Sequence, residues 1–307
     1  SALYGKKRSR WSRPAATVVL AVCALILGAG LAQGKTAPAA LKPTTFLSPQ
    51  SPQSQEGCVY PTAITGTQVI SYTYDPLGRL SVAAYSSGEC FRYGYDAVGN
   101  RTAQTQTITS TVAMTYGYDE ANRLDTLNGQ SVFSWDDSGN LLSDGSALYA
   151  YNSANRLIST TVSGVTTQFV YNGDGARVKL VQAGVPTTYT QDLAAPLPVV
   201  LQAKTGATTT LYLFDVGTRP LAEYDLAWEY LLPDALGGVR QIADGNGYVK
   251  LTEAYEPYGS LLTSQGSATS AFGFTGEQAD AYIKLLYLRA RYMQPTLGIF
   301  LSRDPSG

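Results

Sequence analysis

Tyr72-Thr73-Tyr74-Asp75-Pro76-Leu77-Gly78-Arg79 is the first copy of a short pattern that decides the fold. The pattern is an aromatic residue, any residue, an aromatic residue, Asp or Asn, two residues, Gly or Asn, and a polar or basic residue. The second aromatics of successive copies are 16 to 23 residues apart, and the later copies begin at Tyr93, Tyr116, Phe133, Tyr149 and Phe169. This period indicates a repeat unit of about two strands.

Each repeat has the features of a β-hairpin. Two aromatics at positions i and i+2 share one face of a strand, so their rings can stack across neighbouring strands. The Asp or Asn that follows can bond its own backbone and open a turn, and the Gly or Asn tolerates the left-handed conformation that such turns need. The residues assigned to this structural repeat are Tyr72, Tyr74, Asp75, Gly78, Tyr93, Tyr95, Asp96, Gly99, Tyr116, Tyr118, Asp119, Trp135, Asp136, Tyr149, Tyr151 and Tyr171.

The rest of the repeat region also favours hairpins. Leu141-Leu142 and Leu157-Ile158 begin apolar return strands, and Asn128-Gly129 and Asp144-Gly145 are hairpin-turn pairs. A single hairpin is marginally stable, whereas a stacked series buries one continuous face. We therefore predict an all-β architecture. The 22 tyrosines, against 8 phenylalanines, suit either packing of this sheet or, as an alternative, a platform on which sugars stack.

The amino-terminal segments differ in composition from the repeats. Residues 1–14 form a basic flank, and residues 15–32 carry no charge. This order is typical of a signal peptide, while 18 residues also reach the lower limit for a transmembrane helix, so both interpretations stay open. Residues 33–57 are rich in Pro, Ser, Thr and Gln, which predicts a disordered linker. Either interpretation predicts a protein of the cell envelope, secreted or membrane-anchored, with residues 33–307 outside the cytoplasm.

Composition excludes several functional classes. The chain has no histidine, which removes Ser-His-Asp, Cys-His and His-ligated metal mechanisms. Its three cysteines cannot form a disulfide scaffold or a four-cysteine zinc site. Beyond residue 55, 23 acidic residues face 15 basic ones, and this charge argues against nucleic acid as a partner. We expect no cofactor and no metal.

The repeats resemble the YD repeats of RHS proteins, a family that also contains toxin-complex C components and the teneurin shell. The carboxyl-terminal part follows the RHS-associated core in order: residues 230–241, then Tyr255-Glu256-Pro257-Tyr258-Gly259, Phe274-Thr275-Gly276-Glu277, residues 287–292 and residues 298–305. The family usually has Gly where Lys284 stands, Tyr at Met293 and Arg at Ile299, departures expected to alter local turns. The resemblance runs from about Val69 to Gly307 and implies a spiral of hairpins that forms a partial shell.

The resemblance divides the chain into a YD-repeat region at 58–228 and a core at 229–307, with a hydrophobic helix before them. It implies a structural role, because shells of this family enclose a toxic or adhesive carboxyl-terminal domain. Expected partners are therefore the protein's own carboxyl-terminal cargo, or cell-surface glycans or proteins, together with the membrane if residues 15–32 are retained. A glycan-binding protein that uses exposed tyrosines is an alternative function.

Chemistry is expected at the end of the chain alone. In the family, the core ends in an aspartyl self-cleaving element with an Arg-Asp pair and a second Asp about a dozen residues later. Arg303-Asp304 matches the first half, and two carboxylates that share a proton can act as base and acid. The position of the second Asp would fall beyond Gly307. The chain therefore holds at most half of a catalytic site, and the alternative is that residues 304–307 form a turn.

Two local structures cannot be decided from propensity. Residues 277–293 contain no Gly or Pro and favour a helix, yet apolar residues alternate with Tyr287, Arg289 and Arg291. We predict a strand over Leu285–Met293, with both arginines on one face. Cys58 and Cys90 can pair after export, or remain free thiols.

Overall fold

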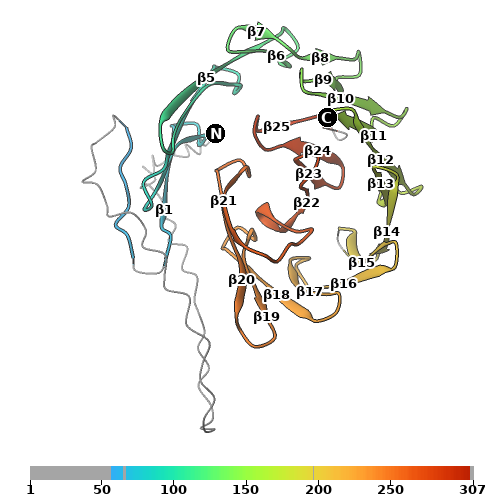
Figure 1. Cartoon of the computed structure of the whole chain (residues 1–307). Helices are drawn as coiled ribbons and strands as arrows, with labels where there is room; N and C mark the ends of the chain where they lie inside the picture. Colours follow the sequence, from blue (N-terminus) through green and yellow to red (C-terminus); the bar gives the residue numbers. More distant parts are fainter. Residues whose placement is uncertain (1–56, 65–66, 196, 305–307) are drawn as a thin grey trace, which may run out of the picture. The chain divides into compact units, whose positions relative to one another are not determined.

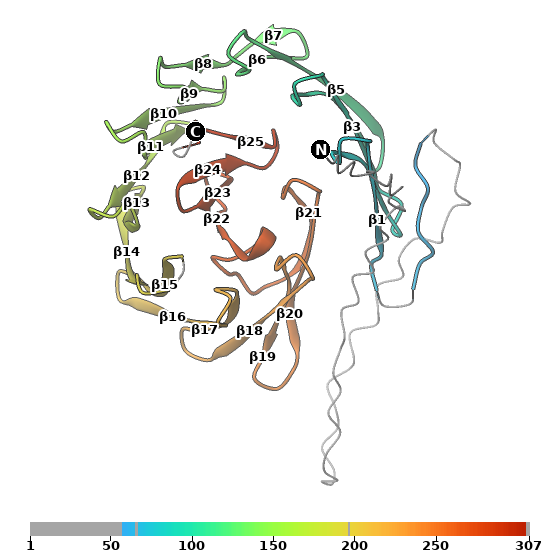
Figure 2. The ribbon, with the colours of Figure 1, turned by 180° about the vertical axis from the view of Figure 1, so that it is seen from behind.

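The structure is a computed structural model that describes residues 57–64, 67–195 and 197–304. The described residues contain no α-helix, and all regular elements apart from one short 3-10 turn are strands, as predicted (Figures 1 and 2). No helix in these ranges is long and apolar enough to cross a membrane. The basic flank, the hydrophobic segment 15–32 expected to be a helix, and the linker 33–57 up to residue 56 lie outside the described residues.

The chain divides into two compact units after Met114. The first contains an antiparallel meander of four strands, β1 (Ile70–Tyr74), β2 (Leu80–Tyr85), β3 (Cys90–Tyr95) and β4 (Arg101–Thr107). Tyr85 and Phe91 are fully buried in it, with their rings edge to face at 5.6 Å. The division falls within β5 (Thr111–Tyr118).

The second unit continues the hairpin series. After β5, the meander continues through β6 (Leu124–Leu127) and β7 (Gln130–Ser131), whose turn is Asn128-Gly129, as predicted. A sheet of 14 strands then runs in chain order from β8 to β21. Its first half is β8 (Ser134–Trp135), β9 (Leu141–Ser143), β10 (Ala147–Tyr151), β11 (Leu157–Val162), β12 (Val165–Tyr171), β13 (Arg177–Gln182) and β14 (Val185–Asp192). Its second half is β15 (Val199–Thr205), β16 (Thr208–Phe214), β17 (Pro220–Tyr224), β18 (Trp228–Pro233), β19 (Val239–Asp244), β20 (Val249–Tyr255) and β21 (Leu261–Gly266).

The carboxyl-terminal residues lie on the concave side of this long sheet (Figures 1 and 2). They comprise the 3-10 turn η1 (Phe274–Gly276) and a four-stranded sheet of β22 (Gln278–Asp280), β23 (Leu285–Leu288), β24 (Arg291–Gln294) and β25 (Ile299–Phe300). One core of the second unit is where Phe272 packs edge to face on Tyr212 and Phe214, against buried Leu231 and Ile242. The small sheet therefore fills the curve of the large one.

The prediction of a single strand over Leu285–Met293 is wrong. The segment forms a tight hairpin of β23 and β24, in which Leu288 pairs with Arg291. Arg289 stands in the turn with φ of 59° and does not share a strand face with Arg291. Lys284, where the family usually has Gly, also has a positive φ of 55°. Neither turn contains a glycine, so no local feature of the sequence indicated these turns.

Candidate functional site

The turn of each repeat is closed by its Asp or Asn. In the first copy, Asp75 Oδ1 accepts the backbone N–H groups of Leu77 and Arg79, each at 2.9 Å, while Oδ2 pairs with Arg79 Nε at 2.6 Å. These bonds hold the pKa of the Asp75 carboxyl below its usual value, first through the Arg79 backbone N–H. Arg79 also donates to the Asp96 carbonyl at 2.7 Å and lies over the Tyr95 ring. One side chain therefore joins two successive repeats.

The two aromatics of a repeat have different roles. The first aromatic of copies two to six is buried, as at Tyr93 and Phe169. A β-bulge at the second aromatic turns it toward the preceding repeat, where Tyr95 donates to the Leu80 carbonyl and Tyr171 to the Leu157 carbonyl, each at 2.7 Å. In these copies, the first ring is therefore packed in the core and the second ring joins neighbouring repeats.

The same turn recurs in the second unit at positions that were not predicted. Asp215 N–H donates to the Arg219 carbonyl at 2.9 Å, and Arg219 Nε returns to Asp215 Oδ2 at 2.7 Å. This copy was missed because Thr218, with φ of 67°, stands where the pattern requires Gly or Asn. The signal that could have revealed it is an Asp followed four residues later by Arg.

The carboxyl-terminal segment joins the large sheet near its first strand, β8. Leu301 is 1% exposed, and its carbonyl accepts both the Leu141 N–H at 2.8 Å and the Tyr151 hydroxyl at 3.0 Å. The Leu301 N–H donates to the Tyr292 carbonyl. Residues 299–301 are therefore held between β9–β10 and the small sheet.

A buried arginine connects the two sheets. Arg177 on β13 is 3% exposed and donates to Tyr292 Oη at 3.0 Å and to Gln278 Oε1 at 2.9 Å. Its guanidinium lies 4.2 Å from the centre of the Tyr287 ring, and its backbone N–H donates to the Tyr287 hydroxyl. Phenolic oxygens and an aromatic face take the place of a carboxylate partner for this cation.

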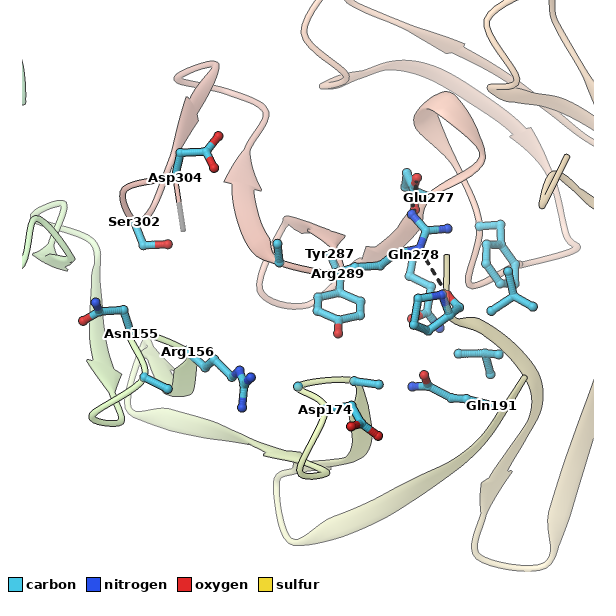
Figure 3. Close-up of a pocket in the computed structure, with 18 of the residues that line it drawn as sticks. Asn155, Arg156, Asp174, Gln191, Glu277, Gln278, Tyr287, Arg289, Ser302 and Asp304 are labelled. Atoms are coloured by element: carbon cyan, nitrogen blue, oxygen red, sulfur yellow. Dashed lines mark hydrogen bonds and ion pairs between the residues drawn. The ribbon is translucent and has the colours of Figure 1, made fainter. Parts of the chain in front are cut away.

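Beside this arginine is a pocket of about 500 Å³ between the turns of the fifth and sixth repeats and the small sheet (Figure 3). Arg289 donates to Glu277 at 2.6 and 2.8 Å and to the Pro198 carbonyl at 3.1 Å. The polar residues that line the pocket are Asn155, Arg156, Asp174, Gln191, Glu277, Gln278, Tyr287, Arg289, Ser302, Arg303 and Asp304.

The predicted half-site lies at the rim of this pocket. Asp304 pairs with Arg291 Nη2 at 2.9 Å, and its side chain is 49% exposed. Arg303 lies against Gly139, where a Cβ would come within 2.6 Å of Arg303 Cγ and Cδ. The pairing of Asp304 with Arg291 was not predicted from the sequence. The catalytic role of Arg303 and Asp304 stays a prediction.

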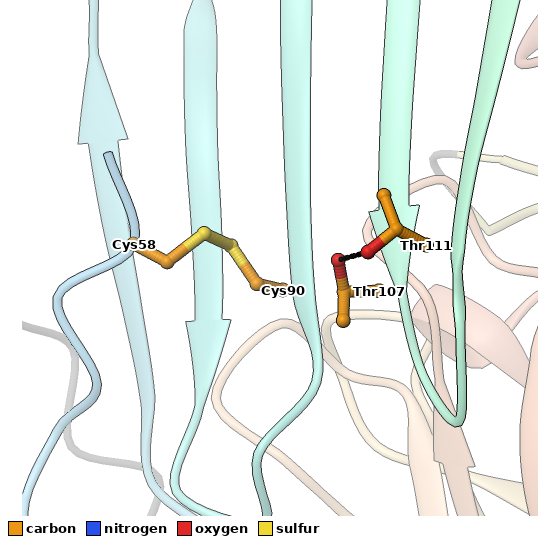
Figure 4. Close-up of a disulfide and its surroundings, with 4 residues drawn as sticks. All are labelled: Cys58, Cys90, Thr107 and Thr111. Carbon is orange, nitrogen blue, oxygen red and sulfur yellow. Dashed lines mark hydrogen bonds between the residues drawn. A yellow bond between two sulfur atoms is a disulfide. The ribbon is translucent and has the colours of Figure 1, made fainter. Parts of the chain in front are cut away.

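A disulfide joins Cys58 to Cys90 in the first unit (Figure 4). The two Cα atoms are 6.4 Å apart, and both residues are buried. The bond ties the segment before β1 to the first residue of β3. Nearby, the hydroxyls of Thr107 and Thr111 share a hydrogen bond of 3.1 Å.

Comparison with known proteins gives matches over most of the chain. The family model of the teneurin YD-shell matches residues 60–307. The tRNA nuclease WapA of Bacillus subtilis is 27% identical over 241 residues, which are 76% of this chain and 10% of that protein. Teneurin-1 of Mus musculus is 29% identical over 229 residues, 72% of this chain and 8% of that protein.

Two further matches are more distant. The double-stranded DNA deaminase toxin A of Burkholderia cenocepacia is 25% identical over 278 residues, 77% of this chain and 19% of that protein. The crystal structure of TcdB2-TccC3-Cdc42 aligns with a TM-score of 0.42 at 17% identity, over 78% of this chain and 17% of that one. The chain spans a fifth or less of the length of each of these proteins.

Proposed function

This chain belongs to the teneurin YD-shell family, and we propose that its function is structural. The hairpin repeats form part of the wall of a shell, and the enclosed cargo is a domain of the same polypeptide. The observation that carries this proposal is the place of the carboxyl-terminal sheet, which lies inside the curve of the 14-stranded sheet and is bonded to it through Arg177 and Leu301.

The kind of cargo follows from the relatives. WapA is named a tRNA nuclease and another relative a double-stranded DNA deaminase toxin, and this chain matches a small part of each. We propose that the cargo of this shell is a toxic domain of a comparable kind, joined after residue 307. Residues 299–304 would then deliver that domain to the concave side of the sheet.

We further propose that the shell works outside the cytoplasm. The basic flank and apolar segment of the sequence support export by a signal peptide or a membrane anchor. The Cys58–Cys90 disulfide supports the same location, because such bonds persist in oxidising compartments.

A processing activity is the second candidate. The placement of Asp304 at the pocket rim, where it pairs with the Arg291 guanidinium, favours it. The test is a chain extended past residue 307 by its natural downstream sequence. Self-cleavage that persists after Asp304→Asn would remove Asp304 from the mechanism.

Limited proteolysis of the full chain tests the wall. We expect residues 58–304 to survive as a resistant core, with early cuts confined to 33–56.

A second preparation carries a short trypsin-sensitive peptide after residue 307, and a matched one carries the same peptide in the Asn128-Gly129 turn. Slower cleavage of the carboxyl-terminal peptide is expected. Equal rates would contradict delivery to the concave side, and uniform digestion of the chain would contradict the wall itself.

A further inference from the structure

One repeat arginine has no acid to pair with. In three copies the residue four positions after the Asp is an arginine bonded to that Asp, at 2.6 Å for Arg79, 2.7 Å for Arg123 and 2.7 Å for Arg219. The fifth copy has Asn152 in place of Asp. Its amide oxygen accepts the Arg156 backbone N–H at 3.0 Å and closes the turn, but it offers no carboxylate to the Arg156 guanidinium.

The freed guanidinium lies in the pocket. Arg156 extends from its turn toward the space between Asp174 and Tyr287 (Figure 3). It crosses Gly175 of the next repeat so closely that a Cβ there would come within 2.4 Å of Arg156 Nη2. Gly175 has φ of +88°, so the left-handed turn favours glycine at this position. The space that the Arg156 side chain occupies requires a glycine there as well.

The pocket lining itself holds three arginines and three acids. An excess of positive charge arises from two arginines just outside the lining, Arg291, which pairs with Asp304, and Arg177, which bonds Gln278. Glu277 is neutralised by Arg289, and Asp304 by Arg291. Arg156 and Arg303 form no ion pair with any described residue. Of the unpaired charged residues of the lining, Asp174 and Arg303 are exposed, whereas Arg156 is partly buried.

Behind the lining stands a further cation, Arg177. Its Nε is buried without a hydrogen-bond partner, and its Nη2 holds Gln278 at the pocket wall. Burial raises the pKa of the Tyr287 hydroxyl, and the charges of Arg177, Arg289 and Arg156 oppose this rise. The Tyr287 side chain lies in the pocket (Figure 3). The chain beyond its amino-terminal segments is acidic, so this is a local reversal of charge.

We propose that this pocket binds a small organic anion through a carboxylate or phosphate group. The planar fork of a guanidinium fits both groups with two parallel hydrogen bonds. Arg156 and Arg303 supply the charge. Neutral donors stand beside them: Ser302 and Asn155, whose own amide oxygen already accepts a hydrogen bond from Asn140. A volume of about 500 Å³ holds a molecule larger than a single oxyanion.

Calorimetric titration of the full chain with two probes, citrate and inorganic phosphate, tests the proposal. We expect saturable binding at one site. Binding of citrate alone indicates a carboxylated ligand, binding of phosphate alone a phosphorylated one, and binding of both supports the shared chemistry. Saturable binding of neither probe overturns the proposal.

Two variants locate the site. Arg156→Gln removes the donor and should weaken binding at least tenfold. Asn152→Asp leaves every lining residue in place but supplies the carboxylate that other repeats have, so Arg156 should pair with it and binding should again fall at least tenfold. The matched control is Arg219→Gln, which removes a repeat arginine outside the pocket and should leave affinity unchanged.

The variants are compared after circular dichroism and thermal unfolding show that each is folded. If Arg156→Gln fails to fold, Asn152→Asp alone decides the question. Unchanged affinity in Asn152→Asp, or an equal loss in Arg219→Gln, contradicts binding by Arg156 in this pocket.

Discussion

The hydroxyl of Tyr151 donates a 3.0 Å hydrogen bond to the carbonyl of Leu301, a residue 150 positions later. Equivalent tyrosines bond the preceding repeat instead, as Tyr95 does with Leu80. At the fifth repeat, the carboxyl-terminal segment has therefore taken the place that a neighbouring strand holds elsewhere.

Tyr151→Phe should destabilise the second unit by about 1 kcal/mol, because it leaves one carbonyl with a single partner. Hydrogen exchange followed by mass spectrometry is the measurement, and residues 299–304 should exchange faster. Tyr95→Phe is the control, since it removes a bond of the same kind in the first unit. Unchanged exchange at 299–304 in Tyr151→Phe would show that this bond does not hold the segment.

Arg177→Lys should be strongly destabilising although it keeps the charge. A lysine cannot donate to Tyr292 and Gln278 from one planar group and stack on Tyr287 as well, so buried acceptors lose their partners. We expect a loss of about 2 kcal/mol or more in the free energy of unfolding, measured with urea. Arg219→Lys, at a side chain 60% exposed, should change it by less than about 0.5 kcal/mol. Similar losses in the two variants would contradict a special role for Arg177.

Glu223 should make stability depend on pH near neutrality. Burial raises the pKa of this carboxyl from 4.5 to about 7, opposed by the Ser270 hydroxyl that donates to it at 2.8 Å and assisted by the charges of Glu229 and Asp225. Between about pH 4.5 and about pH 7, Glu223 keeps its proton in the folded protein but loses it in the unfolded chain. The free energy of unfolding should therefore fall as the pH rises from about 4.5 to about 7, by up to about 3 kcal/mol, and then level off.

Glu223→Gln removes the titrating group and keeps an acceptor for Ser270, so it should flatten this dependence. Urea unfolding at several pH values measures the slope. Glu120→Gln, at an exposed turn position, is the control and should retain it. A slope that survives in Glu223→Gln would assign it to another group.

The Cys58–Cys90 bond should contribute about 4 kcal/mol to the stability of the first unit, because it closes a loop across a sequence separation of 32 residues. A reductant should add the mass of two hydrogen atoms to the intact chain and lower its unfolding midpoint. The double variant Cys58→Ser/Cys90→Ser should not respond to reductant. If the untreated chain already shows two reactive thiols at these positions, the bond does not form in solution.

The fold could be predicted because each repeat carries its own turn. Tyr72 to Gly78 contains the strand end, the Asp that closes the turn and the Gly with positive φ, all within one local segment. Prediction failed where a left-handed residue is not Gly or Asn, as at Thr218 and Arg289. Arg289 is held by Glu277 and by the Pro198 carbonyl, and such contacts are not visible in the local sequence.

The candidate site could be predicted only in small part. Arg303 and Asp304 were singled out because they match the Arg-Asp pair of the family, and their catalytic role stays a prediction. Arg156 and Gln278 are more than a hundred residues apart in the sequence, and they line the same pocket only in the folded protein. The sequence shows that Asn152 replaces Asp in the fifth repeat. It does not show that this replacement leaves the Arg156 guanidinium unpaired in the pocket.

The attachment of Leu301 to β9 and β10 also determines where mechanical force enters the second unit. A load applied to the carboxyl end reaches β9 and β10, the second and third strands of the 14-stranded sheet, and does not act first on its last strand, β21. Tension on the carboxyl end would thus act on the β8 end of the sheet, and the sheet would not be peeled from β21.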